Sequence, residues 1–218
     1  MPTIKKKQKK QPQKEIMTIA QQIVDFVMIY KKPFVITAGL ALLKSHQEKK
    51  AGPLLTLANE YYQGSGQAQP DYAKALELFR DLHKEYPRTI SGAIAQYYIG
   101  NSLVNLGKPD EAITEYRYFI DKYSDEKFLL GLVHQRLGYL YIGLGKKTEA
   151  IQEFEKAEAL NGPGVPTIEL ARLYEMTGNM MESQKKYKVI QEKFSGTMWA
   201  MEAMGKVQAV APAVPQKK

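Results

Sequence analysis

The sequence of 218 residues contains no cysteine, three histidines and a single tryptophan. The absence of cysteine excludes disulfide bonds and cysteine-ligated zinc, and it leaves the redox compartment of the protein open. The histidines are His46, His83 and His134, and none has a second ligand at metal-binding spacing on the same helix face. We therefore predict no metal site, and we interpret His134 as a packed or surface residue of a helix.

The phosphate-binding patterns GxxxxGK[ST] and GxGxxG are absent, although the chain has 16 glycines. A nucleophile–base pair is not evident either. Acidic pairs such as Asp110-Glu111 and Asp125-Glu126 fall in turns or at helix starts, where they stabilise the helix dipole without a catalytic role. The sequence therefore predicts that the protein is not an enzyme and takes no cofactor and no small-molecule substrate.

Long hydrophobic runs are also absent. The apolar stretch from Phe34 to Leu43 is about half as long as the ~20 residues that a membrane-spanning helix needs. An interfacial helix, a buried helix and the core of a signal peptide all have this length. The long segment before the stretch and the lack of a small-x-small cleavage site after it argue against a signal peptide. Membrane contact fits the stretch better than membrane spanning.

The net charge of +8 is confined to the N-terminal segment. Residues 1–50 contain 11 lysines and 3 acidic residues, whereas residues 51–218 contain 20 basic and 20 acidic residues. A neutral body offers no electrostatic footprint for DNA or RNA, so we predict no nucleic-acid partner. A basic segment beside apolar residues instead favours the anionic surface of a membrane, which we expect residues 5–43 to contact.

The N-terminal segment divides into a tail and a helical stretch. Residues 1–14 carry almost no apolar side chains and are expected to be a basic, disordered tail. Apolar residues then recur every three or four positions from residue 15 to residue 30, which predicts an amphipathic helix. Lys31-Lys32-Pro33 predicts an interruption before the short apolar run. We interpret residues 15–50 as a helical segment that anchors the protein to a membrane or to a partner.

From residue 51 the chain repeats itself. Four segments share a small residue that is followed four positions later by an aromatic residue. The segments are DYAKALELF (71–79), KPDEAITEY (108–116), KKTEAIQEF (146–154) and NMMESQKKY (179–187). The small residues Ala75, Ala112, Ala150 and Ser183 are 37, 38 and 33 positions apart. These spacings are close to a repeat of ~34 residues with loop insertions.

Each segment is preceded by a helical pattern with its own small residue, so each repeat is expected to be a helix hairpin. The small residues of the first helices are Ala58, Gly100, Gly138 and Ala171, and glycines at 107, 145 and 178 end three of these helices. We expect Gly138 to face Ala150 where the two helices of its hairpin meet. The aromatic residues are expected to fill the space between successive hairpins. Each hairpin leaves an apolar face that only its neighbour covers, so the hairpins should stack.

This pattern resembles the tetratricopeptide repeat (TPR) family over residues 53–195. The resemblance implies an all-α fold, a TPR-type α-solenoid of about four helical hairpins plus a capping helix, preceded by the N-terminal helical segment. We place the TPR domain at residues 51–207, its closing helix at 196–207, and a disordered tail at 208–218. The methionines between residues 176 and 181 favour a loosely packed fourth repeat over an adaptable binding surface.

The layout as a whole resembles a narrower group, the membrane-anchored periplasmic TPR proteins that include the ancillary subunit of the bacterial Sec translocon. The resemblance covers the lysine-rich start, the helix at 15–30, the phrase KKPFVITAGLALL and the repeats. In those relatives a full hydrophobic anchor follows the Lys-Lys-Pro, whereas here the apolar run stops at Leu43. The resemblance implies a bacterial inner membrane location, with repeats in the periplasm and proteins as clients. A cytoplasmic or peripheral location is the alternative.

In the TPR family the first helices line a concave groove, so the resemblance also implies a set of groove residues. They are Tyr62, Tyr97, Asn101, Asn105, Gln135, Tyr139, Arg172 and Glu175. Tyrosine and asparagine combine rigid apolar area with hydrogen bonds, which suits the binding of peptides. The register of the repeats predicts that Asn101 and Tyr139 point away from their hairpin partners, with Tyr97 on the same face. Tyr97 and Tyr139 are therefore expected to have no packing role.

Two functions fit these observations. The first is a membrane-associated TPR scaffold that binds other proteins, such as envelope or translocating clients at a bacterial inner membrane. The second is a soluble or peripheral assembly subunit of a larger complex, which uses residues 15–43 as a partner-binding helix.

Overall fold

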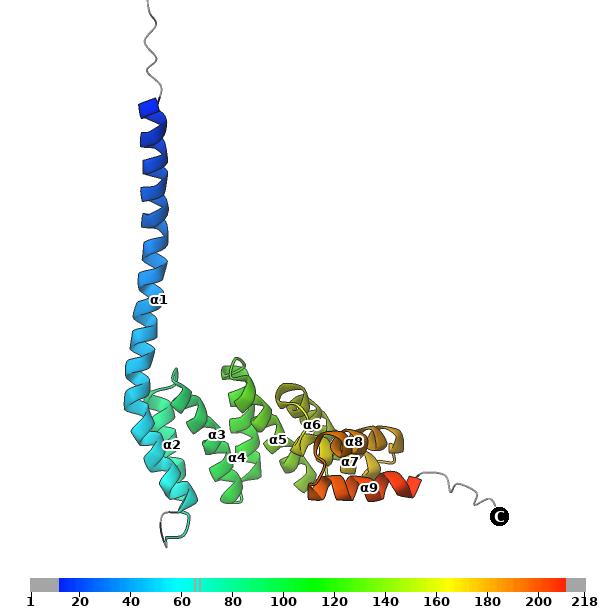
Figure 1. Ribbon diagram of the computed structural model, residues 1–218. Coiled ribbons are helices and arrows are strands. Elements are labelled where there is room, and N and C mark those ends of the chain that lie inside the picture. Colours follow the sequence, from blue (N-terminus) through cyan, green and yellow to red (C-terminus); the bar gives the residue numbers. More distant parts are fainter. Residues whose placement is uncertain (1–11, 65, 67, 211–218) are drawn as a thin grey trace, which may run out of the picture. The chain divides into compact units, whose positions relative to one another are not determined.

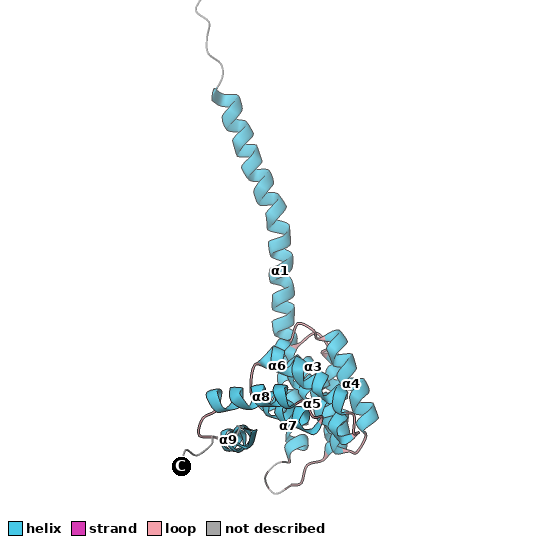
Figure 2. Cartoon of the chain, turned by 90° about the vertical axis from the view of Figure 1, so that its right-hand side faces the viewer, coloured by secondary structure: helices cyan, strands magenta, loops and turns pink. Residues whose placement is uncertain are grey.

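The computed structural model describes the backbone of residues 12–64, 66 and 68–210, and the side chains of residues 37, 39–64, 66 and 68–207. All regular structure in this part of the chain is helical (Figure 2). The helices are α1 (Pro12–Gln63), α2 (Tyr72–Glu85), α3 (Ile90–Asn105), α4 (Pro109–Lys122), α5 (Lys127–Gly143), α6 (Lys147–Asn161), α7 (Val165–Met176), α8 (Met180–Lys193) and α9 (Met198–Val210). The predicted tails at 1–14 and 208–218 lie mostly outside the described residues.

The chain divides into two compact units, Met1–Lys49 and Lys50–Lys218. The described part of the first unit is the N-terminal portion of α1. This helix continues through Lys31–Pro33, so the predicted interruption is wrong. A proline removes one backbone hydrogen bond and can kink a helix without ending it.

The side chains described near the end of the first unit include exposed leucines. Leu40, Leu42 and Leu43 have exposed fractions of 61%, 72% and 61%. Among the described residues, no helix has an apolar stretch long enough to cross a membrane.

The second unit consists of four helix hairpins and a closing helix (Figure 1). The C-terminal part of α1 pairs with α2, where the Tyr62 ring lies 5.4 Å from the Tyr72 ring. The pairs α3–α4, α5–α6 and α7–α8 follow, and α9 packs against α8. The predicted all-α solenoid of about four hairpins with a capping helix is confirmed.

The turn inside each of the last three hairpins uses a glycine in the left-handed conformation. Gly107, Gly145 and Gly178 have φ values of 72°, 71° and 79°. The amide of Gly107 donates to the Val104 carbonyl at 3.0 Å, and the amide of Lys108 donates to the Leu103 carbonyl at 2.9 Å. The same two hydrogen bonds recur around the other two glycines. They satisfy carbonyls that the end of a helix would otherwise leave unpaired, as the sequence predicts.

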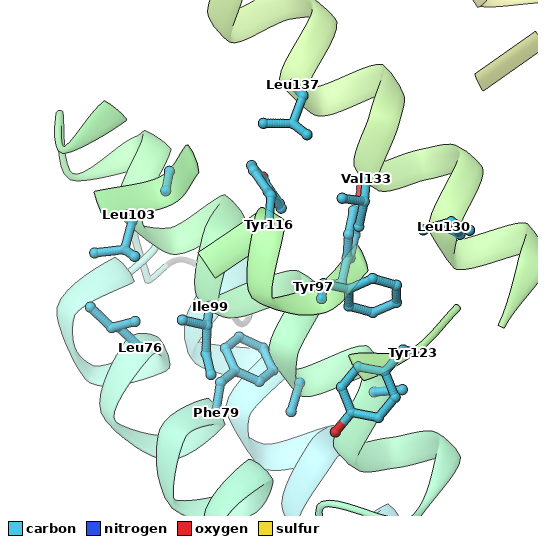
Figure 3. Packing of buried hydrophobic residues seen from close by; sticks show 14 of the residues in the cluster. Leu76, Phe79, Tyr97, Ile99, Leu103, Tyr116, Tyr123, Leu130, Val133 and Leu137 are labelled. Carbon is cyan, nitrogen blue, oxygen red and sulfur yellow. The ribbon is translucent and has the colours of Figure 1, made fainter. Parts of the chain in front are cut away.

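The close approach of the helices in the second and third hairpins depends on a glycine that lies under an aromatic ring. A Cβ atom at Gly100 would lie 2.3 Å from the Tyr116 ring, and one at Gly138 would lie 2.7 Å from the Phe154 ring. Both rings are fully buried, and Figure 3 shows Tyr116 among the core side chains of α2, α3 and α5. These aromatic residues therefore fill space within their own hairpin. The nearest neighbour of Gly138 is this ring, and not Ala150 as expected.

The fourth hairpin and α9 share a separate apolar cluster. Its buried members are Ile168, Ala171, Tyr187, Ile190 and Ala203. Trp199 and Val207 of α9 pack against it, and the Thr197 hydroxyl accepts a hydrogen bond from the Ala200 amide at 3.3 Å. The predicted closing helix with its threonine cap is therefore confirmed.

The methionines beside this cluster do not belong to it. Met176, Met180 and Met181 have exposed fractions of 60%, 49% and 68%. The expectation of loose core packing in the fourth repeat is therefore wrong. The turn between α7 and α8 carries these side chains on the surface, because Tyr187 and Ile190 already fill the interior of the hairpin.

We expect Gly138→Ala to lower the free energy of unfolding by about 1–3 kcal/mol, because the added carbon overlaps the Phe154 ring. Gly138→Leu should cost more. Gly143→Ala on the same helix is the matched control, since no heavy atom lies within 4 Å of a Cβ there. It should be neutral or stabilising by up to about 1 kcal/mol. Chemical denaturation of the full chain, followed by circular dichroism, measures these differences. Equal midpoints for all variants and the parent would contradict the packing described above.

Candidate functional site

A pocket of about 210 Å³ lies on the first helices of the first three hairpins. Four of the predicted groove residues line it, Tyr62 from α1, Asn101 and Asn105 from α3, and Tyr139 from α5. Val104, Arg136 and Leu140 complete the lining. The structure thus brings half of the predicted groove residues into one pocket, while their role in binding stays a prediction.

Hydrogen bonds hold the polar side chains of the pocket in place. The Asn105 side-chain amide donates to the Tyr62 hydroxyl at 3.0 Å and to the Asn101 carbonyl at 3.1 Å. Burial raises the pKa of Tyr62 above its ordinary value, against an opposing effect of the hydrogen bond from Asn105. The Tyr62 hydroxyl is therefore protonated at neutral pH, and its own proton remains able to point at a bound group.

Asn101 differs from its predicted orientation. Only 3% of this residue is exposed, and its Oδ1 atom accepts a hydrogen bond of 2.6 Å from the Tyr116 hydroxyl. Tyr116 belongs to α4, the second helix of the same hairpin. Asn101 therefore bonds to its hairpin partner, and the prediction that it points away from that partner is wrong. The buried hydroxyl of Tyr116 needs an acceptor, and the short asparagine side chain supplies one.

Tyr97 is a packing residue, contrary to the sequence-based expectation. It is 8% exposed, and its ring lies 5.3 Å from the Tyr98 ring and 6.4 Å from the Tyr116 ring. Its hydroxyl accepts a hydrogen bond from Nε of Arg136 at 3.2 Å. The first helix of a repeat contacts its own partner helix and both neighbouring hairpins, so Tyr97 is covered although it lies one turn from Asn101 on the same helix face.

Tyr139, like Asn105, is a predicted groove residue that lines the pocket, is exposed and forms a hydrogen bond there. It is 37% exposed, and its ring contacts the Phe154 ring edge-on at 5.1 Å. Its hydroxyl donates to Oε1 of Glu169 at 3.4 Å. Partial burial and the neighbouring Glu169 carboxylate raise the pKa of Tyr139 to about 12, so it stays a neutral donor at physiological pH.

Three pocket residues are absent from the predicted groove set, Val104, Arg136 and Leu140, and Arg136 is the charged one. It is exposed and bonds to the Tyr97 hydroxyl of the preceding hairpin. Arg136 precedes Tyr139 by three positions, which places both on one face of α5. Once Tyr139 was assigned to the groove, this spacing of three positions could have indicated that Arg136 also faces the groove.

The remaining predicted groove residues lie outside the pocket. Arg172 binds Glu169 at 3.0 Å and Glu202 of α9 at 2.6 Å, and the hydrogen bond that it donates to Glu202 is the main cause of its raised pKa. Glu175 binds Lys206 of α9 at 2.6 Å, and this bond lowers its pKa. Gln135 is half-buried and does not line the pocket. Arg172 and Glu175 of α7 are therefore paired with side chains of the closing helix.

The pattern of acidic and histidine residues gives no sign of a metal centre. The part of the chain that the structure describes has no group of three or more such residues placed to hold a metal ion. His134 is buried, with Nδ1 at 2.5 Å from Oε2 of Glu153, which agrees with its interpretation as a packed residue. Burial would raise the pKa of Glu153, but hydrogen bonds from His134 and Lys156 lower it overall.

Comparisons with known proteins agree with this architecture. Models of the tetratricopeptide repeat match residues 94–125 and 133–162, which correspond to the second and third hairpins. The chain contains tetratricopeptide repeats. No curated protein sequence matches the chain. The pocket lies on first helices of the second unit, Lys50–Lys218, which contains these repeats and which we call the TPR unit.

Solved TPR structures share the fold at low sequence identity. A tetratricopeptide repeat protein from Parabacteroides merdae ATCC 43184 has a TM-score of 0.60 and 15% identity over 73% of this chain, which spans 59% of that protein. A set of nearly identical TPR-like repeats from Podosopora anserina has a TM-score of 0.55 and 17% identity, over 73% of this chain and 84% of the other. At such identities these likenesses show the fold alone.

Tyr97 and Tyr139 should respond differently to truncation, because the first is buried and the second is exposed. Tyr97→Ala should lower the free energy of unfolding by about 3 kcal/mol, as for other buried aromatic residues. Tyr139→Ala should cost about 1 kcal/mol or less. Tyr97→Phe keeps the ring and loses only the hydroxyl, so it should cost about 1 kcal/mol. Denaturant midpoints of the full chain test this order. A Tyr97→Ala variant as stable as Tyr139→Ala would contradict the packing role of Tyr97.

Proposed function

We propose that this protein is a membrane-associated TPR scaffold that binds protein clients through the pocket on α1, α3 and α5. Its clients are envelope or translocating proteins at a bacterial inner membrane, with the TPR unit in the periplasm. The observation that carries the proposal is the pocket itself, where first helices of three successive repeats present tyrosine, asparagine and arginine side chains.

The size of the pocket supports a protein client over a small molecule. Sites for drug-sized ligands typically enclose ~300–1,000 Å³, and this pocket encloses about 210 Å³. That volume suits one side chain of a bound peptide, with the rest of the peptide lying along the groove. The half-exposed ring of Tyr139 and the apolar edge of Leu140 would contact such a side chain, while Asn105 and Tyr62 supply hydrogen bonds.

The membrane part of the proposal rests on the N-terminal segment. Residues 1–50 carry the whole net charge of +8, and the same segment presents the exposed leucines at 40, 42 and 43 on α1. Basic residues near an anionic surface each contribute about 1 kcal/mol of attraction. The resemblance of the N-terminal layout to membrane-anchored periplasmic TPR proteins agrees with this location.

A second candidate is a peripheral assembly subunit that uses residues 15–43 to bind another protein. The observation that favours it is the exposed apolar surface of Leu40, Leu42 and Leu43, which a partner protein would bury. The two candidates differ in what the N-terminal segment binds, because the alternative predicts retention by a protein partner and none by lipid vesicles.

Client binding should depend on the exposed pocket residues. We expect the double variant Asn105→Ala/Tyr139→Ala to lose most co-purifying proteins from an envelope extract, because truncating a central interface tyrosine commonly costs about 2 kcal/mol or more. The control is Tyr118→Ala, which removes a tyrosine of similar exposure, 44%, from α4 outside the pocket. Circular dichroism checks that both variants are folded. Full recovery of clients by the double variant would place the binding surface elsewhere.

Vesicle binding should depend on the basic tail. Neutralising its lysines in the full chain should weaken sedimentation with phosphatidylglycerol vesicles by about tenfold or more at low salt. The lysines to change to glutamine are Lys5, Lys6, Lys7, Lys9, Lys10 and Lys14. The matched control changes exposed lysines of the TPR unit, Lys84, Lys122, Lys146, Lys147, Lys188 and Lys193.

Equal vesicle binding by both sets of variants would refute the electrostatic part of the proposal. Binding that resists high salt would favour hydrophobic insertion of the leucines over charge attraction, because salt screens the lysines and not the leucines. Absence of binding to any vesicle would favour the peripheral assembly subunit.

A further inference from the structure

The pocket contains a positive charge and no acidic side chain. Arg136 is its only titratable cation, and the other lining residues are neutral, namely Tyr62, Asn101, Val104, Asn105, Tyr139 and Leu140. Among the described residues, no carboxylate lies within 4 Å of the Arg136 guanidinium. Its described hydrogen bond uses only Nε, which donates to the Tyr97 hydroxyl.

Unlike Arg136, the charged groups described on the next first helix are paired with groups of opposite charge. Arg172, on the next first helix, binds two carboxylates, those of Glu169 and Glu202. Glu175 is neutralised by Lys206. Glu169 accepts from the Tyr139 hydroxyl at the edge of the pocket, and it shares the cation Arg172 with Glu202. Arg136 is thus a cation that the protein has oriented in the groove without supplying a counter-ion within 4 Å.

The geometry of Arg136 suits a carboxylate. Its bond to Tyr97 fixes the guanidinium from the Nε side, and the terminal N–H groups are the part that can pair with two carboxylate oxygens. The Tyr62 hydroxyl accepts its hydrogen bond from Asn105, so its own proton is available to the same carboxylate. Two fixed donors at one small pocket discriminate a carboxylate from a neutral amide of the same shape.

We propose that the pocket selects client segments with an aspartate or glutamate side chain, whose carboxylate pairs with Arg136 and accepts from Tyr62. This inference rests on the proposed client-binding function and specifies the chemistry that the site recognises. An acidic client would also meet no net repulsion from the TPR unit, because residues 51–218 carry equal numbers of acidic and basic side chains.

The test uses the immobilised full chain and a phage-displayed library of short random peptides. A selected peptide is then synthesised with blocked ends, in its acidic form and with its acidic residue changed to glutamine or asparagine. We expect enrichment of acidic residues among the selected peptides, and affinity that falls about tenfold or more on neutralisation. Arg136→Gln should remove that difference between the two peptides, and Arg136→Lys should restore part of it.

The matched control is Arg117→Gln. Arg117 is also exposed, and its Nη2 atom donates to a tyrosine hydroxyl, that of Tyr141, at 3.0 Å, but it does not line the pocket. This variant should keep the full preference for the acidic peptide. Fluorescence polarisation gives the affinities, and circular dichroism confirms that each variant is folded.

Each other outcome has a distinct meaning. If Tyr139→Ala weakens peptide binding but the affinity does not depend on the charge of the peptide, the inference is overturned and the proposed client-binding function stays intact. Binding that needs a free terminal carboxylate, and is insensitive to the acidic side chain, assigns the pocket to a chain end instead. Peptide binding that neither Asn105→Ala/Tyr139→Ala nor Arg136→Gln affects would overturn both the inference and the proposed function.

Discussion

The contact between a glycine and a buried aromatic ring is the constraint on which the centre of this solenoid depends. Gly100 and Gly138 have no side chain, so the rings of Tyr116 and Phe154 lie directly on the backbone of the first helices. Each ring is fully buried, and burial of an aromatic side chain contributes about 1.5–3 kcal/mol. The same contact sets how closely two helices approach and where the next hairpin can stack. Larger residues at either glycine would therefore disturb both the hairpin and the stack.

This packing contact also positions the candidate site. The Tyr116 ring lies on Gly100, and its hydroxyl then reaches Asn101 at 2.6 Å. The Asn101 carbonyl in turn accepts from the Asn105 side chain, which donates to Tyr62. The third repeat has Phe154 in place of Tyr116, so no hydroxyl reaches the equivalent first-helix position. That position is Tyr139, which is left half-exposed with its hydroxyl facing Glu169. Two differences between the repeats, Phe154 for Tyr116 and Tyr139 for Asn101, thus separate a buried, structural position from an exposed one.

The sequence was sufficient to predict the repeats, because hairpin packing imposes a local pattern. A small residue, an aromatic residue four positions later and a turn glycine recur at nearly constant spacing, and the structure places the hairpins and the turn glycines as expected. The aromatic rings lie within their own hairpins and not between successive ones. The exposure of individual groove residues could not be predicted in the same way. A first helix touches three other helices, so its register does not decide whether Tyr97 is covered by the next hairpin. Arg136 bonds to Tyr97 and Arg172 bonds to Glu202, and each pair is separated by 30 or more residues, so no local pattern encodes these contacts.

The closing helix explains why the pocket lies in the first three repeats and does not extend to the fourth. Family register places Arg172 and Glu175 in the same groove, yet both pair with α9, through Glu202 and Lys206. These pairs are partly exposed, and each contributes at most about 1 kcal/mol, so they cannot by themselves hold a helix. The buried Ala203 and the packed Trp199 and Val207 supply the larger stabilisation. The ion pairs instead pair Arg172 and Glu175 of α7 with opposite charges of α9, so these two side chains already have partners within the protein. Arg136 of α5 has no such ion-pair partner within 4 Å among the described residues. Its charge is therefore available to a client.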